Sequence, residues 1–313
     1  MRKTGCCFIL VLLMQLLPAQ LPVAGLIAHY GFNNNVQDET SHRNHGTITG
    51  AVNRTTDRFG NPCGAMHFDG YSGYVTVPNS PSLQSPYNAI SVAAWIKLDK
   101  PYTGTDKWIT LICKGRYAAE TPTNPQYRFQ VFQGSRQSTV SVNTEFTEYD
   151  NQFTAHPFDY NRWYFYTLVY DGNTVYVYLD GVNIFQFAYA GVFNTNSDDL
   201  EIGHDVPGST EFFAGAMDDL RLYNRVLTQN DINTLYNDQT GSRFTDDFTL
   251  SPVQNIEKNT DAGKCYATVN FAPPAVTVGC GNASVIQVLG AGSGSQFATG
   301  RQYIKLSLIH ISQ

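Results

Sequence analysis

The chain of 313 residues is poor in basic residues and has no cluster of lysine and arginine. Lys and Arg number 20 against 26 Asp and Glu, so the formal net charge at pH 7 is −6. A protein that follows nucleic-acid phosphates normally presents a face or stripe rich in Lys and Arg. The composition therefore argues against nucleic acid as a partner, and its mild acidity suits a secreted soluble protein.

No apolar run in the sequence reaches the roughly 20 residues that a membrane-spanning helix needs. The strongest run, FILVLLMQLL, follows two basic residues and precedes small residues, which is the pattern of a secretory signal peptide. We expect residues 1–19 to be this signal, with cleavage after Ala19 leaving Gln20 as the new N-terminus. Cleavage at Ala24 or Gly25 is the alternative. The sequence therefore predicts export, to the cell surface or the extracellular space, without a membrane span.

Motifs of several enzyme classes are also missing, among them the Cys-x-x-Cys, Gly-x-Ser-x-Gly and His-Glu-x-x-His patterns. The nearest approach to the paired carboxylates of a glycosidase is EFTEYD at 145–150. There Glu148 and Asp150 would share one face of a strand, whereas Glu145 would point to the other face. A solvated acidic loop is the simpler interpretation. We therefore expect no catalytic constellation and keep hydrolysis by Glu148 and Asp150 as an alternative.

Tyrosine and phenylalanine are abundant, with 19 of each, and Gly, Asn, Asp and Pro divide the chain into many short runs. This rhythm favours an all-β class and a two-sheet antiparallel sandwich. Two Asp-Gly pairs, Asp171-Gly172 and Asp180-Gly181, predict tight turns because such turns need positive φ.

One strand and one helix are predicted between Phe213 and Tyr236. Apolar or small residues alternate with polar ones from Ala214 to Leu222, so we expect a strand with one buried face. Thr228 is placed as the N-cap of a short helix, with Asp231 as its partner three residues on. The stretch is therefore predicted to close the domain.

Three motifs in order resemble the laminin-G-like, concanavalin A-type jelly-roll family of lectins and glucanases. They are LIAHYGFNNNVQDETSHRNHGTITGA at 26–51, FDGYSGYVTVPNSPSL at 68–83 and GAMDDLRLYNRVLTQNDINTLY at 215–236. The resemblance covers residues 26–237 and implies a jelly-roll sandwich with one short C-terminal helix.

The resemblance also implies a structural calcium site. In this family the first loop lies beside the closing strand, which would bring oxygens of Asp38 and Asn44 near Asp218. Calcium takes about six to eight oxygen ligands. The pattern departs from the family at His42, where glycine is usual, and Arg43 adds a positive charge nearby. The alternative is that Asp38 and Asn44 only form the turn while Asp218 accepts loop hydrogen bonds.

Carbohydrate binding would use aromatic rings that stack on sugar faces. Residues 116–160 are the least regular part of the domain, and loops on a rigid scaffold often carry function. The candidates around them are Trp108, Tyr117, Tyr127, Tyr149 and Phe153. For any single ring, packing in the core or across strands is the alternative.

Four cysteines follow the signal peptide, and an even number in an exported chain allows disulfides. We expect one bridge in each domain, Cys63–Cys113 and Cys265–Cys280. A redox role is not expected.

The C-terminal part resembles the first half of a hyalin-repeat (HYR) module, an immunoglobulin-like β-sandwich, through a Cys-x-Ala-x-Val start, a proline pair and a second cysteine. We expect a linker at 238–260 and a partial module at 261–300. The final YIKLSLIHISQ abandons the repeat pattern, so residues 301–313 are expected to be a foreign or disordered tail.

These features together predict an exported, non-catalytic recognition or adhesion module, part of a larger extracellular or cell-surface protein similar to bacterial surface proteins. Its partner would be a glycan or an extracellular protein. A polysaccharide-degrading enzyme or its accessory domain, and a structural spacer, are the alternatives.

Overall fold

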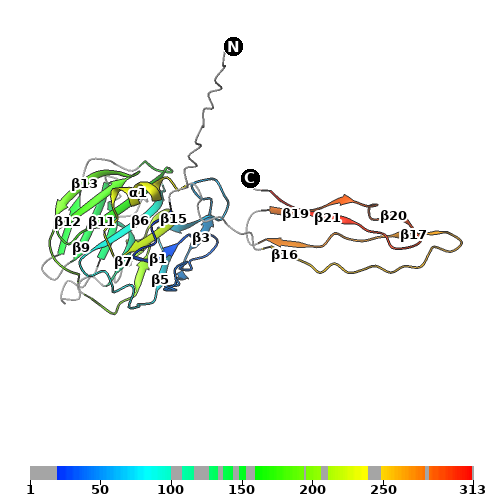
Figure 1. Cartoon of the computed structure of the whole chain (residues 1–313), viewed down its shortest axis with the longest axis horizontal. Coiled ribbons are helices and arrows are strands. Elements are labelled where there is room, and N and C mark those ends of the chain that lie inside the picture. The colour runs from blue at the N-terminus through cyan, green and yellow to red at the C-terminus, as the bar shows by residue number, and fades with distance from the viewer. Residues whose placement is uncertain are drawn as a thin grey trace, which may run out of the picture.

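The computed structural model in Figure 1 describes the chain in ten segments. They are residues 20–99, 108–115, 127–132, 137–143, 148–152, 159–193, 195–205, 211–238, 248–278 and 282–311. Two antiparallel sheets form a sandwich, a helix follows, and small two-stranded sheets complete the described part. The predicted all-β jelly-roll class is confirmed.

The first sheet has eight strands, and its middle is made by the strands that the sequence marks most clearly. In spatial order they are β13 (Val182–Ala188), β12 (Thr174–Leu179), β11 (Trp163–Tyr170), β6 (Ile90–Leu98), β15 (Ala214–Tyr223), β4 (Ala65–Asp69) and β3 (Val52–Thr55), and β1 (Leu26–Tyr30) also pairs with β15. The turn between β12 and β13 is Asp180-Gly181, and both residues have positive φ, 50° and 80°. This hairpin follows the prediction.

The second sheet has seven strands. In spatial order they are β10 (Glu148–Gln152), β9 (Gln137–Asn143), β8 (Tyr127–Phe132), β7 (Trp108–Lys114), β14 (Leu200–Ile202), β5 (Tyr74–Val77) and β2 (Thr47–Thr49). The described part of the acidic stretch predicted as a loop, residues 148–150, therefore lies in strand β10. Backbone pairing with β9 along its whole length satisfies its amide groups, so the charged side chains do not prevent a strand.

The core lies between the two sheets and is rich in aromatic rings. Phe68 of β4 packs edge-on against Phe32 and Phe213, at ring-centre distances of 6.4 and 5.8 Å. On the facing sheet, Tyr127 packs against Phe193 at 6.2 Å. Burial of these rings is the main stabilising term of the sandwich, since each removes about 150–250 Å² from water.

Helix α1 (Gln229–Tyr236) lies on the outer face of the eight-stranded sheet, as Figure 1 shows. The predicted capping box is confirmed: the Thr228 hydroxyl accepts from the Asp231 N–H, and the Asp231 carboxylate accepts from the Thr228 N–H. Ile232 and Leu235 are buried beneath the helix together with Phe165. Within the described residues, no helix combines the length and apolar character that crossing a membrane requires.

Strand β15 is buried along its whole length, so the prediction of one buried face is wrong. Neighbours cover both faces. Met217 and Leu220 face the core, while Tyr223 packs beneath α1. Asp218 and Asp219 are buried as well, among charged partners from the first loops.

Neither predicted disulfide is formed. Cys113 of β7 has a buried thiol whose Sγ donates to the Gly115 carbonyl at 3.2 Å, while Cys63 is disulfide-bonded, though not to Cys113. The pairing fails because Cys63 lies in the turn before β4 of the eight-stranded sheet, whereas Cys113 follows the core residue Ile112 on β7 and so faces away from that sheet. Cys265 is an exposed thiol, and Cys280 lies outside the described residues.

The C-terminal part forms three two-stranded sheets. They pair β16 (Phe248–Leu250) with β18 (Val276–Val278), β17 (Tyr266–Val269) with β20 (Ser295–Ala298), and β19 (Asn282–Leu289) with β21 (Lys305–Ile311). Two boundaries differ from the prediction, because β16 begins inside the expected linker and β21 is an ordered strand inside the expected tail. Ala267 is the one apolar residue of this part, within the described segments, that belongs to the buried core. The HYR module stays a prediction.

Candidate functional site

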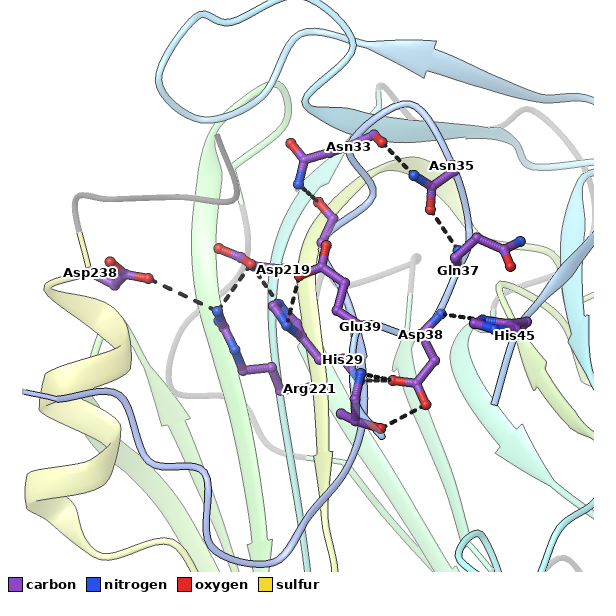
Figure 2. Close-up of polar contacts among 12 residues, drawn as sticks. His29, Asn33, Asn35, Gln37, Asp38, Glu39, His45, Asp219, Arg221 and Asp238 are labelled. Carbon is purple, nitrogen blue, oxygen red and sulfur yellow. Dashed lines mark hydrogen bonds and ion pairs between the residues drawn. The ribbon is translucent and has the colours of Figure 1, made fainter. Parts of the chain in front are cut away.

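Asp38 organises the first loop, beside His45 in Figure 2. Its carboxylate accepts hydrogen bonds from the N–H groups of His29, Thr40 and Asn44 at 2.9, 2.9 and 2.8 Å. The Thr40 hydroxyl donates to it at 2.8 Å. A carboxylate has about four lone-pair sites, so these donors leave little capacity for a metal ion. Asp38 therefore acts as a buried turn former.

Asn44 ties this loop to its neighbours. Its side-chain Nδ2 donates to the Ile27 carbonyl at 2.8 Å and to the Ser82 hydroxyl at 2.9 Å, while its Oδ1 accepts from Ser80 at 2.7 Å. Its backbone carbonyl accepts from the Tyr30 hydroxyl at 2.7 Å. These contacts use both ends of the amide to join β1, the loop and the turn after β5.

Asp218 faces an arginine. The pairing register of β15 with β6 shifts between Asp218 and Arg221, and Asp219 takes a left-handed φ of 53° there. Both carboxylates thereby meet the fork of Arg58, whose Nη1 contacts Asp218 and whose Nη2 lies 2.7 Å from Asp219. The guanidinium also stacks over the Trp95 ring, 5.0 Å from its centre. Arg58 thus supplies the positive charge beside Asp218 that a calcium ion was expected to supply.

Asp219 contacts two further side chains, His29 and Arg221, which Figure 2 shows. His29 Nε2 lies 3.0 Å from one of its oxygens, and Arg221 Nη2 lies 3.2 Å from it. Burial alone would raise the pKa of Asp219, but Arg221, His29 and Arg58 hold it below its usual range. For Asp218, burial and the neighbouring Asp219 charge raise the pKa, and Arg58 opposes this. We call Arg58, Asp218, Asp219, His29 and Arg221 the ionic cluster.

The predicted calcium ligands do not form an oxygen cage. Asp38 and Asn44 are brought together, but their oxygens are used within the loop, and Asp218 pairs with Arg58. Among the described residues, no group of three or more Asp, Glu, His or Cys side chains is arranged to hold a metal ion. The residues present therefore do not fit a calcium ion, and calcium stays a prediction without support from this arrangement.

The predicted sugar-stacking rings are not assembled into a surface by the described residues. Tyr127 is fully buried in the core, and burial raises the pKa of its hydroxyl. The side chains of Trp108 and Tyr149 lie outside what the structure describes, as do Tyr117 and Phe153 entirely. For Tyr127 the core-packing alternative is the one realised.

A line of paired residues crosses the seven-stranded sheet from edge to edge. Strand register aligns Thr47, Thr76, Glu201, Cys113, Arg128, Ser141 and Asp150. Their neighbours along the strands, such as Val75, Leu200 and Phe129, belong to the core. Because strand side chains alternate between faces, Thr76, Glu201, Cys113 and Arg128 occupy the outer face. We call these four residues the polar row.

Glu201 is the centre of the polar row. It is only 8% exposed, and its two carboxylate oxygens share one donor, the Thr76 hydroxyl, at 3.0 and 3.2 Å. Burial and the nearby Asp199 charge raise the pKa of Glu201 to about 7, despite the Thr76 hydrogen bond. The carboxylate of Glu201 can thus accept more hydrogen bonds than the single Thr76 hydroxyl donates. Sequence reasoning missed this residue, although a charge between two apolar residues in LEI was a usable signal.

Charged and aromatic groups flank Glu201. Arg128 Nη1 donates to Asp205 at 3.0 Å, and the Cys113 Sγ lies 3.3 Å from the other Asp205 oxygen. The ring of His204 packs against those of Tyr74 and Phe212, at centre distances of 4.7 and 4.4 Å, and the latter two rings lie 6.2 Å apart. The outer face therefore combines hydrogen-bonding groups with flat aromatic rings.

Lys114 is a second buried cation at the end of β7. Its Nζ donates to the carbonyl and side-chain oxygens of Asn196 at 3.4 and 2.9 Å and to the Asp198 carbonyl at 2.5 Å. Burial lowers its pKa to about 8. These contacts hold the loop that leads into β14 and so fix the start of the strand that carries Glu201.

Glu201 and Asp150 are too far apart to form the carboxylate pair of a glycosidase. Asp150 stands four strands away from Glu201 in the aligned register, which corresponds to about 19 Å at the spacing of neighbouring strands. Glycosidase carboxylates lie roughly 5–9.5 Å apart. A pair formed by Glu148 and Asp150 themselves falls on side chains outside the described residues.

Comparison with known proteins supports the fold. The family model described as "Concanavalin A-like lectin/glucanases superfamily" matches residues 69–233. Domain 4 of AbnA, a GH43 extracellular arabinanase from Geobacillus stearothermophilus solved with arabinotriose, is 22% identical with a TM-score of 0.51, over 67% of this chain and 98% of that one. None of the curated proteins matches the chain.

Two larger structures are similar at lower coverage. The binding domain of botulinum neurotoxin DC, solved with SialylT, is 16% identical with a TM-score of 0.51, over 68% of this chain and 51% of that one. Trypanosoma rangeli sialidase, solved with sialic acid, is 17% identical with a TM-score of 0.53, over 72% of this chain and 35% of that one. This chain thus spans about half of the first and a third of the second.

Proposed function

Because the chain belongs to the concanavalin A-like lectin/glucanase superfamily, we propose that it is an exported, non-catalytic module that binds carbohydrate. The proposed site is the outer face of the seven-stranded sheet around Glu201. Similar folds solved with arabinotriose, SialylT or sialic acid support the ligand class. They support it by analogy, since at these identities the likeness extends to the fold alone.

The observation that carries the proposal is the difference between the two outer faces of the sandwich. Helix α1 covers the eight-stranded sheet, where its Ile232 belongs to one apolar cluster with Phe165 of β11. The outer face of the seven-stranded sheet instead carries the polar row, with Glu201 holding a single hydroxyl donor among the hydrogen bonds of the described residues. A buried acceptor with spare capacity is costly unless a partner fills it.

A sugar supplies the missing partner. Hydroxyl groups on neighbouring carbons both donate, and they fit the two oxygens of one carboxylate. The apolar faces of a sugar ring suit flat rings such as Tyr74 and Phe212. The carboxylates of Glu201, Asp199 and Asp205 outnumber Arg128 here, so we propose a neutral rather than an acidic glycan.

Export, adhesion and membership of a larger surface protein are proposed with this function. The N-terminal pattern of basic, apolar and small residues supports export. The strand pairs from β16 to β21 support a second extracellular module, for which the hyalin-repeat resemblance remains the proposal. An extracellular protein partner is the outcome to consider if no glycan binds.

A glycan array tests the function. The full chain, secreted by a host that recognises its leader, is assayed at neutral pH on neutral and acidic glycans. Selective binding to neutral glycans is the expected result. Binding to acidic glycans alone would reject the proposed ligand class, and a blank array from a folded sample would reject carbohydrate binding.

A further inference from the structure

Residues 20–25, which we call the N-terminal arm, lie against the end of β15. Leu21 packs beside the apolar side chains beneath α1. The Pro22 carbonyl accepts a hydrogen bond from the Tyr223 hydroxyl at 3.0 Å. Burial raises the pKa of Tyr223 to about 12, so this hydroxyl remains a donor at neutral pH. The arm thus supplies an apolar contact and an acceptor to the sandwich.

Arg225 fixes the last residues of the arm. Its Nε donates to the Ala24 carbonyl at 2.6 Å, and its Nη1 pairs with Asp231, in the capping box of α1, at 2.9 Å. The Asn224 N–H donates to the Gly25 carbonyl at 2.9 Å. One arginine therefore joins the arm to the start of the helix.

These contacts discriminate between the cleavage sites that the sequence leaves open. Cleavage after Ala24 or Gly25 would remove the Pro22 carbonyl, the acceptor of the buried Tyr223 hydroxyl, which is costly to leave unpaired. It would also remove the Ala24 carbonyl, one acceptor of the partly exposed Arg225. Gln20, in contrast, is exposed.

We propose that the leader is cut between Ala19 and Gln20 and that the new N-terminal Gln20 cyclises to pyroglutamate. This inference rests on the export proposed above. The α-amine of Gln20 attacks Cδ of its own side chain, the N–Cδ bond forms as the Cδ–Nε2 bond breaks, and the amide nitrogen leaves as ammonia with a proton from the amine. No oxidant or second reactant is consumed. The cut keeps every arm contact from Leu21 onward.

Mass spectrometry of the full chain, secreted from its own leader, tests both steps. The N-terminal peptide should begin at Gln20 and lack the mass of one ammonia. A Gln20→Ala variant is the matched control, which should be cut at the same bond and keep its full mass. A start at Gly25 or Leu26 would overturn the cleavage site, and a linear Gln20 after long incubation at neutral pH would overturn the cyclisation.

The two proposals fail separately. Protein that reaches the medium or surface with residues 1–19 attached would overturn the processing site alone, and protein that never leaves the cell would overturn export with it. Correctly cut protein that binds no glycan would support the processing site and count only against carbohydrate binding.

Discussion

The sandwich holds two buried acidic centres that differ in the partners of their carboxylates. In the ionic cluster, Asp219 contacts two arginines, Arg58 and Arg221, and the ring of His29. In the polar row, Glu201 has one neutral donor, Thr76, and a pKa raised to about 7. The carboxylates of the first centre are paired with arginines of the chain itself, whereas Glu201 retains acceptor capacity. Carboxylates that are paired within the chain stabilise the fold, whereas a carboxylate with unused acceptor sites is the better candidate for binding a ligand.

The location of each centre agrees with this division. The ionic cluster joins β1, the loop of Arg58 and β15, so it fastens segments that lie about 160 residues apart in the chain. The polar row lies on a sheet face that the described helix does not cover. The contrast therefore predicts large stability effects at the cluster and ligand effects at the row.

Replacing Arg58 by Met should give the largest effect. It would leave Asp218 and Asp219 as buried carboxylates without their shared fork, and breaking a buried ion pair costs about 3–5 kcal/mol. The free energy of unfolding from urea titration measures this. Arg54→Met, at an exposed arginine, is the control and should change stability by less than about 0.5 kcal/mol. Equal losses of stability at the two positions would show that the ion pairs of Arg58 do not stabilise the fold more than an exposed arginine does.

Replacing Glu201 by Gln should change how stability depends on pH. Because the folded pKa is raised to about 7, above the usual value of about 4.3, the folded state binds more protons than the unfolded state between these values. Stability of the unchanged protein should therefore fall as pH rises from about 5 to 8, on the order of 2 kcal/mol relative to the variant. Melting temperatures across this range measure it. A constant difference between variant and parent would refute the assignment.

Thr228→Ala should give a smaller, purely structural effect. Loss of the N-cap hydroxyl removes one partner of the Asp231 N–H, and such changes cost about 1 kcal/mol. Thermal unfolding measures it, and glycan affinity should not change because α1 covers the other sheet. An affinity loss as large as that of a polar-row variant would mean that the helix face contributes to binding.

Calcium should give the smallest effect. Since Asp38 is saturated by hydrogen bonds and Asp218 pairs with Arg58, adding Ca²⁺ or a chelator should leave the melting temperature unchanged. A rise that saturates with Ca²⁺ and disappears in an Asp38→Asn variant would restore the ion implied by the family resemblance.

The sequence predicted the sandwich closely where strands are apolar and bounded by turn residues. The strand expected from Ala214 to Leu222 agrees with β15 (Ala214–Tyr223), and the expected Asp180-Gly181 turn joins β12 to β13. Strands β2 and β3 are short and largely exposed and therefore lack a clear alternating pattern. Strand β10 was missed because its acidic residues resemble a loop.

The candidate site was less accessible to sequence reasoning. The resemblance correctly drew attention to Asp38, Asn44 and Asp218, which are all buried, but it assigned them to a metal. Arg58 and Asp218 pair although they lie 160 residues apart in the chain, and no local sequence pattern predicts such a contact. The Cys63–Cys113 bridge was wrong because the face of the sheet on which Cys113 lies depends on the pairing of β7 with its neighbours, which a count of cysteines does not reveal.

The most direct test compares the affinity of the parent, Glu201→Gln and Glu39→Gln for the glycan that the array selects, by isothermal titration calorimetry at pH 8. Both variants exchange one carboxylate for an amide, but Glu39 contacts His29 of the ionic cluster at 3.3 Å and not the polar row. We predict that Glu201→Gln weakens binding by about tenfold or more, about 1.4 kcal/mol, while Glu39→Gln leaves it unchanged. Equal affinity for all three proteins would contradict a glycan site at Glu201.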